Sequence, residues 1–190
     1  MLELVALGSD PEIGRQVARE LSGMAYVAVD DRDLPFRCLV RAVTDRPEVL
    51  GAAGDVGRYV VFSRVMRDRP EASSPGDPTP GLVAAFPLFR KTSLDREPAD
   101  RHWREVHAPL ALKHHPGMCD YVQLSVVETL SGPAYDGIAL CGFADREDMK
   151  RRFFGSDEDR RVILDDVAKF TDPVRSLHRV VTQRSIFGPR

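Results

Sequence analysis

The chain lacks the residues and runs that mark several classes of protein. Three of its 190 residues are cysteines, Cys38, Cys119 and Cys141, and they form no CxxC pair and no spacing that suits a metal. Such a small, odd number is typical of a cytoplasmic protein with reduced thiols. No apolar run approaches the ~18 residues that span a membrane, and the N-terminal segment lacks the basic start of a signal peptide. These absences predict a cytoplasmic protein without a membrane partner.

An excess of charge of either sign is also missing. The 27 basic and 29 acidic residues are interspersed and give a net charge of −2. Binding to nucleic acid needs clustered Lys and Arg, and the most basic stretch, 150–152, follows the acidic residues Asp145, Glu147 and Asp148. The sequence therefore predicts no nucleic-acid partner. Hydrophobic residues make up 43% of the chain, which is enough for a folded core.

Common cofactor and catalytic motifs are absent too. The segment 8–14, GSDPEIG, has neither GxGxxG spacing nor the lysine of a phosphate-binding loop, and the chain contains no GxSxG. We read this segment as a strand-to-helix turn. The sequence thus predicts no nucleotide, flavin, haem or other cofactor.

A stretch rich in proline and glycine divides the chain. Residues 70–81, PEASSPGDPTPG, contain four prolines and two glycines, as expected of an exposed linker. Before it, the patterning predicts strands at 2–7, 24–29, 36–43 and 58–66 and helices that begin near Pro11 and Pro47. After it, strands are predicted at 82–90, 118–127, 135–143 and 174–186, and helices at 95–115, 145–153 and 159–170. Asp10 and Asp95 are the predicted N-caps of the first helix in each part.

The two parts therefore share the order β-α-β-β-α-β, which is that of a split-βαβ, ferredoxin-like unit. A short echo supports the repeat, because Gly23-Met24 and Gly117-Met118 open the second strand of each part. Such a unit leaves one sheet face without helices, and two such faces can bury each other. We predict an α+β fold with a degenerate ferredoxin-like unit at 1–69, a linker at 70–81 and a second unit at 82–190.

The second part resembles a known family. The segments FRKTSLDREPADRHWREVHAPLALKHHPGMCDYVQ and YDGIALCGFADREDMKRRFFGSDEDRRVILDDVAKFTD contain W-x-x-x-H-x-P-L-A, then P-G-x-x-x-Y-V-Q, Y-D-G-I-A and a late F-x-D. Over about 82–187 this pattern resembles the EthD family of dimeric α+β barrel proteins. The first part carries no such motif.

The resemblance implies a ferredoxin-like fold whose sheet pairs with another to form a barrel, here within one chain. Family members usually pair as two chains, so a homodimer is the alternative. The family is loosely tied to oxidoreductase systems, since it is named from an ether-degradation cluster. Its barrel relatives include polyketide cyclases, cofactor-free quinone-forming monooxygenases, tautomerases and dehydratases.

Residues 102–117 hold four of the five histidines and the one tryptophan. No two of these histidines are four residues apart, as a helical zinc site requires, so we predict no metal. Trp103 and His107 share one helical stripe, and Pro109 should loosen the helix just after His107. Two interpretations of His107 stay open, a structural histidine that pins this kink and a general acid/base. His102, His114 and His115 are predicted to lie on the surface.

Strand alternation predicts which side chains face the barrel interior. The aliphatic set Val122, Leu124 and Val126 suits packing beneath helices, which assigns Tyr121, Gln123 and Ser125 to a cavity inside the barrel. The same logic assigns Tyr135, Ala139, Cys141 and Phe143 to the cavity, with Arg90 at its rim; the phase of His178 is ambiguous. Cys141 is expected to be a buried filler.

The first functional hypothesis is a cofactor-independent enzyme that acts on a small aromatic or polyketide-like substrate by cyclisation, tautomerisation, dehydration or oxygenation. Its predicted catalytic residues are His107 and Tyr121, and the predicted substrate-binding residues are Gln123, Trp103, Arg90, Tyr135, Phe143 and His178. The alternatives are an oxidoreductase-associated accessory protein or non-catalytic binder, and a structural module whose barrel has no cavity.

Overall fold

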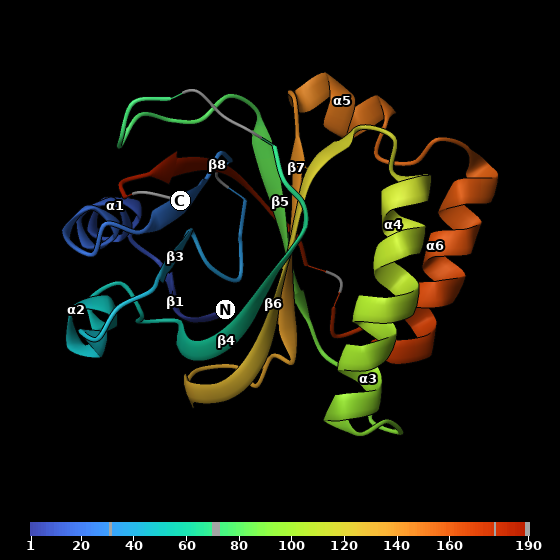
Figure 1. Cartoon of the computed structure of the whole chain (residues 1–190), viewed down its shortest axis with the longest axis horizontal. Coiled ribbons are helices and arrows are strands. Elements are labelled where there is room, and N and C mark those ends of the chain that lie inside the picture. The colour runs from blue at the N-terminus through green and yellow to red at the C-terminus, as the bar shows by residue number, and fades with distance from the viewer. Residues whose placement is uncertain (31, 70–72, 177, 189–190) are drawn as a thin grey trace.

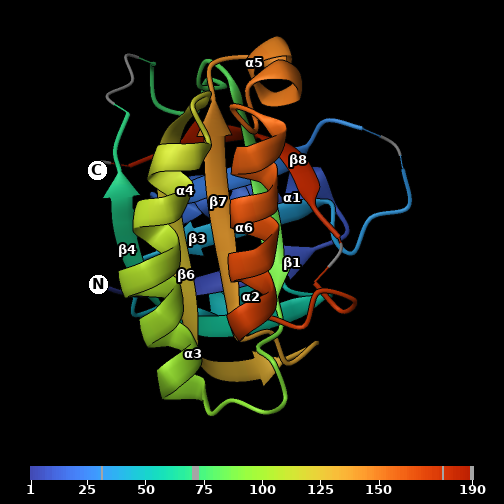
Figure 2. The same cartoon turned by 90° about the vertical axis from the view of Figure 1, so that its right-hand side faces the viewer.

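A closed barrel of eight antiparallel strands forms the centre of the computed structural model, which describes residues 1–30, 32–69, 73–176 and 178–188. The strands follow one another around the barrel in the order β1-β3-β2-β8-β5-β7-β6-β4. Helices α1 and α2 lie outside the barrel on one side, and α3, α4 and α6 lie on the other (Figures 1 and 2). Among the described helices, none is both long and apolar enough to cross a membrane.

The observed elements follow the predicted order. Before residue 70 they are β1 (Leu2–Gly8), α1 (Pro11–Glu20), β2 (Met24–Ala28), β3 (Cys38–Ala42), α2 (Pro47–Gly51) and β4 (Gly57–Arg67). After it they are β5 (Leu82–Leu88), α3 (Arg96–His102), the π-helical turn η1 (Trp103–His107), α4 (Ala108–His114), β6 (Met118–Ser131), β7 (Gly137–Phe143), α5 (Arg146–Arg151), α6 (Asp157–Phe170) and β8 (Val180–Ile186). The last strand is shorter than predicted, because it begins only at Val180.

Local signals explain where the helices begin. The Asp10 carboxylate accepts hydrogen bonds from the backbone N–H groups of Glu12 (2.8 Å) and Ile13 (3.2 Å), and Pro11 occupies the first helical position. Ser156 caps α6 in the same way. Asp95 is the N-cap residue of α3 as predicted, although its side chain makes no capping hydrogen bond.

The long helical segment from α3 to α4 changes its winding at η1. Pro109 has no N–H to donate and its ring would clash with a carbonyl one turn back. The chain accommodates it by a wider turn, in which the Ala108 N–H donates to the carbonyl of Trp103. The predicted irregularity is therefore present, but it precedes Pro109 and ends at His107.

The direction of the β6 side chains corrects a prediction. Val122, Leu124 and Val126 belong to a buried cluster with members from all eight strands, so they face the barrel interior. Tyr121 belongs instead to the cluster beneath the helices, together with Trp103. The assignment of Tyr121, Gln123 and Ser125 to a cavity inside the barrel is therefore wrong, because both faces of β6 are buried and the helix side carries the polar residues.

The same reversal holds for β7. Ile138 and Leu140 lie in the barrel core, whereas Ala139, Cys141 and Phe143 lie beneath the helices. All seven residues of this strand are buried. Since apolar side chains occupy both faces, alternation alone does not show which face lies in the barrel core and which lies beneath the helices.

The described part of the predicted linker, 73–81, lies along β8. The backbone N–H groups of Gly76 and Thr79 donate to the carbonyls of Ile186 and Arg184, both at 2.7 Å. Thr79 is buried, while most of its neighbours are exposed. Residues 70–72 of this segment lie outside the described residues.

Candidate functional site

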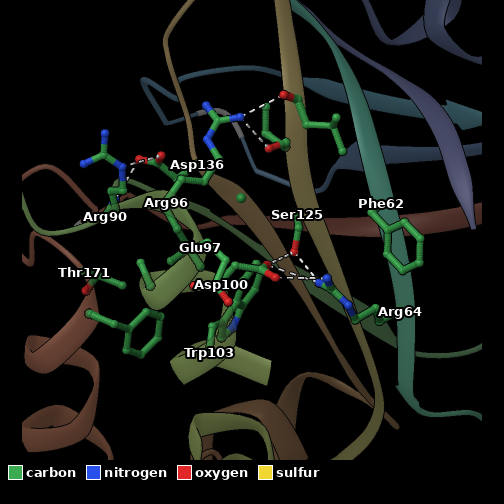
Figure 3. A pocket seen from close by; sticks show the side chains of 16 residues that line it. Phe62, Arg64, Arg90, Arg96, Glu97, Asp100, Trp103, Ser125, Asp136 and Thr171 are labelled. Carbon is green, nitrogen blue, oxygen red and sulfur yellow. Dashed lines mark hydrogen bonds and ion pairs between the residues drawn. The ribbon is translucent and has the colours of Figure 1, made fainter. Parts of the chain in front are cut away.

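A pocket of about 330 Å³ lies outside the barrel, between α3, the outer face of β6 and β7, and the end of α6 (Figure 3). Its apolar lining includes Phe62, Leu88, Trp103 and Phe170. Polar side chains reach it from two walls. We call it the helix-side pocket.

A buried hydrogen-bond network supports the floor of this pocket. Trp103 is 4% exposed, and its indole N–H donates to the Tyr121 hydroxyl at 3.1 Å. The Gln123 amide nitrogen donates to the same hydroxyl at 3.0 Å and to the Trp103 carbonyl at 3.1 Å. Burial raises the pKa of Tyr121 well above its usual value, so this phenol stays protonated at neutral pH. The Gln123 carbonyl oxygen is buried and finds no hydrogen-bond partner within the described residues.

Gly137 leaves room for the indole of Trp103. A Cβ atom at this position would lie 2.5 Å from the indole Cζ3 and 3.2 Å from the Leu124 carbonyl oxygen. We expect Gly137→Ala to lower the free energy of unfolding by about 1 to 3 kcal/mol, because the ring must leave its rotamer or the strands must move apart. Urea denaturation measures this. Gly51→Ala is the control, since a Cβ there meets its first neighbour at 3.4 Å, and an equal loss in both variants would contradict the close contact.

One wall of the helix-side pocket carries a compact polar cluster (Figure 3). Arg64 of β4 donates to the Asp100 carboxylate at 2.9 and 3.2 Å and to the Ser125 hydroxyl at 2.5 Å. Ser125 in turn donates to Asp100. Because Arg64 precedes the linker while Asp100 and Ser125 follow it, the two parts of the chain build this wall together.

The other wall is held by Arg90 and Arg96. Arg90 forms an ion pair with Asp136 at 3.2 Å and donates to the Leu94 carbonyl at 2.8 Å. Arg96 donates to the Val126 and Val127 carbonyls at 3.0 and 2.8 Å. Arg90 therefore does lie at the rim of a cavity, but this cavity is the helix-side pocket rather than the barrel interior.

Two histidines share one buried carboxylate beside the pocket. His107 Nδ1 and His102 Nε2 each lie 3.0 Å from an oxygen of Asp166, which is 1% exposed. Burial raises the pKa of Asp166, but the hydrogen bonds and charges of the two histidines outweigh it and lower the pKa to about 2. Phe170, which lines the pocket, contacts both imidazoles with ring centroids 5.2 Å apart. His107 itself is not among the lining residues.

The predicted surface positions of three histidines need correction. His102 is partly buried against Asp166, and His114 and His115 are 9% and 6% exposed. His114 pairs with Asp159 of α6. His115 contacts the Phe153 carbonyl, and burial lowers the pKa of His115 to about 4, so it is neutral at physiological pH. The reason for the error is that α6 and the aromatic residues after α5 cover the end of α4.

The remaining predicted site residues lie apart from this pocket. Tyr135 lies in the barrel core, with its ring 4.9 Å from that of Phe89. Phe143 stacks on Phe153 at 5.5 Å, beneath the helices. His178 is exposed and lines a separate surface hollow. The structure thus brings together Trp103, Tyr121, Gln123 and Arg90, but not these three.

Several polar residues of the site were missed by the sequence reasoning. Asp166 had a usable signal, because it lies three residues after Ile163 and four before Phe170, on the buried stripe of α6. Arg64 and Asp100 come from separate elements and had no such signal, whereas strand alternation did mark Ser125 as a cavity-facing residue, although for the barrel interior. Within the described ranges, no three His, Cys, Asp or Glu side chains converge as a metal site would require.

Comparisons with known proteins give one family and a few distant folds. The EthD domain model matches residues 91–174, and curated proteins give no significant match. Among solved structures, an anthrone oxidase-like protein has a TM-score of 0.55 at 12% identity over 97% of this chain and 90% of that chain, so the two share the overall fold. An EthD family protein from Bacillus halodurans c-125 has a TM-score of 0.40 at 19% identity, over 53% of this chain and 93% of that chain. The heme-degrading enzyme from Listeria monocytogenes has a TM-score of 0.45 at 11% identity, over 98% of this chain and 99% of that chain.

Proposed function

Since residues 91–174 of this chain match the EthD domain model, we propose that the protein is a cofactor-independent enzyme that performs acid/base chemistry on a small aromatic or polyketide-like molecule. The observation that supports this most strongly is the helix-side pocket, in which an apolar floor meets the cluster of Arg64, Asp100 and Ser125. Pockets that bind small organic molecules combine such apolar surface with a few placed polar groups.

The chemistry of the lining favours a planar, largely apolar ligand. The indole of Trp103 and the ring of Phe170 offer aromatic surfaces. Arg64 is a fixed cation whose guanidinium can donate to a carbonyl oxygen, and the Ser125 hydroxyl lies beside it. A bound ketone would place its oxygen at this wall and its rings over the floor.

Proton removal from a carbon next to that carbonyl is a step common to tautomerisation, aldol-type cyclisation and dehydration. The negative charge then moves to the carbonyl oxygen, where Arg64 would stabilise it. Such stabilisation is effective because the donor is already positioned and partly shielded from water.

His107 is the proposed proton acceptor. The Asp166 carboxylate is ionised at neutral pH and can accept only, so it holds the proton of His107 on Nδ1 and leaves Nε2 basic. Phe170 contacts the His107 ring and lines the pocket, so its side chain controls the access of a substrate to this imidazole. Tyr121 is proposed to act with Gln123 by positioning Trp103, since its hydroxyl is engaged by both residues.

Deuterium exchange into anthrone tests the proposal. Anthrone is a three-ring ketone with an acidic CH₂ group, and we choose it because one protein of the same fold is anthrone oxidase-like. Under anaerobic conditions the protein should accelerate the exchange, and His107→Asn should slow the accelerated rate by at least about tenfold. Quenching of Trp103, the only tryptophan, measures binding in the same samples.

His114→Asn is the matched control, because His114 also pairs with an aspartate of α6 but lies away from the helix-side pocket. It should retain the accelerated exchange. Equal rates in the wild type and His107→Asn would contradict the role of His107. Absence of anthrone binding would contradict the proposed substrate class.

A non-catalytic binder of similar molecules is the second candidate. The observation that favours it is that His107 is 8% exposed and does not line the pocket, so proton transfer needs a movement of Phe170. A binder would quench Trp103 fluorescence on addition of anthrone without any acceleration of exchange.

We also propose that 1–69 and 82–190 are two ferredoxin-like units joined by 70–81. Their strand orders support this, since β4-β1-β3-β2 and β8-β5-β7-β6 follow the same internal order around the barrel. A cytoplasmic location and a homodimer stay predictions of the sequence.

A further inference from the structure

Another hollow, of about 620 Å³, lies at one end of the barrel, where β2 begins and β8 ends. It shares no lining residue with the helix-side pocket. We call it the barrel-mouth hollow. It is separate from the proposed catalytic site, so an inference about it does not depend on that proposal.

Two buried ion pairs line the barrel-mouth hollow. Arg41 donates to the Glu3 carboxylate at 2.6 and 2.7 Å and to the Ser63 hydroxyl at 2.9 Å. Arg184 donates to the Asp120 carboxylate at 2.7 Å. All four charged side chains are between 5% and 8% exposed.

Neighbouring strands carry these groups around the barrel wall. In the order β6, β4, β1, β3, β2 and β8, the contributed side chains are Asp120, Ser63, Glu3, Arg41, Tyr26 and Arg184. The bond between Arg184 and Asp120 closes this polar ring across β5 and β7. Gly142 of β7 makes room for it, since a Cβ there would lie 2.6 Å from the Cβ of Asp120.

Tyr26 lies on β2, between the strands that carry the arginines of the two ion pairs. It lies directly opposite Arg184 in the β2–β8 register. Burial lowers the pKa of Arg41, but the neighbouring Tyr26 hydroxyl and Glu3 carboxylate outweigh it and raise the pKa. The two arginines therefore flank one phenol on adjacent strands.

The stability of the fold does not explain this ring of buried polar side chains. Desolvation of two ion pairs costs about as much as their attraction returns, and apolar side chains would pack at least as well. The middle of the same barrel is filled by aliphatic residues such as Val61, Leu124 and Leu140. The buried charges line the hollow instead of this solid core, which is the arrangement of a binding site.

We propose that the barrel-mouth hollow binds a small zwitterion with an apolar side chain, that is, a free α-amino acid or a close analogue. The four buried charges sum to zero, and the Met1 ammonium group and the Asp68 carboxylate, which also line the hollow, carry opposite charges, so a ligand of net charge would leave an unbalanced charge at this end of the barrel. A zwitterion offers a carboxylate to Arg41 and Arg184 and an ammonium group to Glu3 and Asp120. Met24, Val65, Val122 and Ile186 supply the apolar wall for its side chain.

Calorimetric titration with three molecules of similar shape tests this proposal. L-leucine carries both charges, 4-methylpentanoate lacks the ammonium group and 3-methylbutylamine lacks the carboxylate. L-leucine should bind at least about tenfold more tightly than either partial analogue. Equal affinities, or no heat with leucine, would overturn the proposal.

Variants locate the site. Glu3→Gln combined with Arg41→Gln removes both charges of one pair without leaving a lone buried charge, and leucine affinity should fall at least about tenfold. The matched control is the exposed pair on α6, Glu158→Gln with Arg161→Gln, which should bind leucine normally. Unchanged binding in the first double variant would overturn the proposal.

Chemical shifts of the wild-type protein give a measurement that does not depend on the folding of any variant. Leucine should move the backbone amide signals of Arg41 and Arg184 and leave those of Trp103 and Ser125 in place. Shifts confined to Trp103 and Ser125 would assign leucine to the helix-side pocket and overturn the proposal.

Discussion

Trp103→Ala is expected to lower the free energy of unfolding by about 3 to 5 kcal/mol, which is the usual range for a fully buried large aromatic residue. Trp103 is 4% exposed and packs against Gly137 of β7. Its removal leaves a cavity beneath η1, and the Tyr121 hydroxyl loses the indole donor. Urea denaturation followed by circular dichroism at pH 7 measures the change.

Two further variants separate packing from hydrogen bonding. Trp103→Phe keeps an aromatic ring but removes the donor to Tyr121, so its loss should be smaller than that of Trp103→Ala. Phe62→Ala also removes an aromatic side chain that lines the helix-side pocket, but Phe62 is 40% exposed and its loss should be small. Similar losses for Trp103→Ala and Phe62→Ala would contradict the role of Trp103 as the anchor of this helix.

The elements of the fold could be predicted because their signals are local. At α1, for example, Asp10 and Pro11 mark the start of the helix, and Val17 and Ala18 lie on its buried face. Such signals depend on residues within a few positions of one another. They do not depend on which surface the element later covers.

Alternation could not predict which face of each strand lies inside the barrel and which lies beneath the helices. Leu124 and Gln123 are adjacent on β6, point to opposite faces and are both 0% exposed. The sequence distinguishes an aliphatic face from a polar one, but either face can lie beneath a helix. Here the polar face lies there because Trp103 supplies an indole N–H and a backbone carbonyl that pair with Tyr121 and Gln123.

The partner of His107 could not be predicted from the sequence for a different reason. Asp166 lies 59 residues further along the chain, and only the packing of α6 against η1 brings the two together. The spacing of Ile163, Asp166 and Phe170 shows that a carboxylate interrupts a buried stripe. It does not show which groups pair with that carboxylate: His102 and His107 both contact it, and the Lys169 ammonium group lies 3.5 Å away.

This shared carboxylate should make stability depend on pH in acid. Asp166 has a pKa of about 2 in the folded protein, against an ordinary value of 3.8. A lowered pKa means that the ionised form stabilises the fold, so the contribution is complete above about pH 4 and is lost as the pH falls toward 2. From the size of the shift, this contribution is about 2 kcal/mol.

The comparison of the wild type with Asp166→Asn isolates this contribution from that of the other carboxyl groups. At pH 7 the variant should be less stable by about 2 kcal/mol, because an amide cannot replace the charge that faces His102 and His107. The difference should shrink between pH 4 and pH 2, where the wild-type carboxylate also becomes neutral. Asp165→Asn is the control on the same helix, since Asp165 is 66% exposed and its substitution should have little effect at any pH. A stability difference for Asp166→Asn that stays constant from pH 7 to pH 2 would mean that hydrogen bonding or packing, not the charge of Asp166, holds the two histidines against α6.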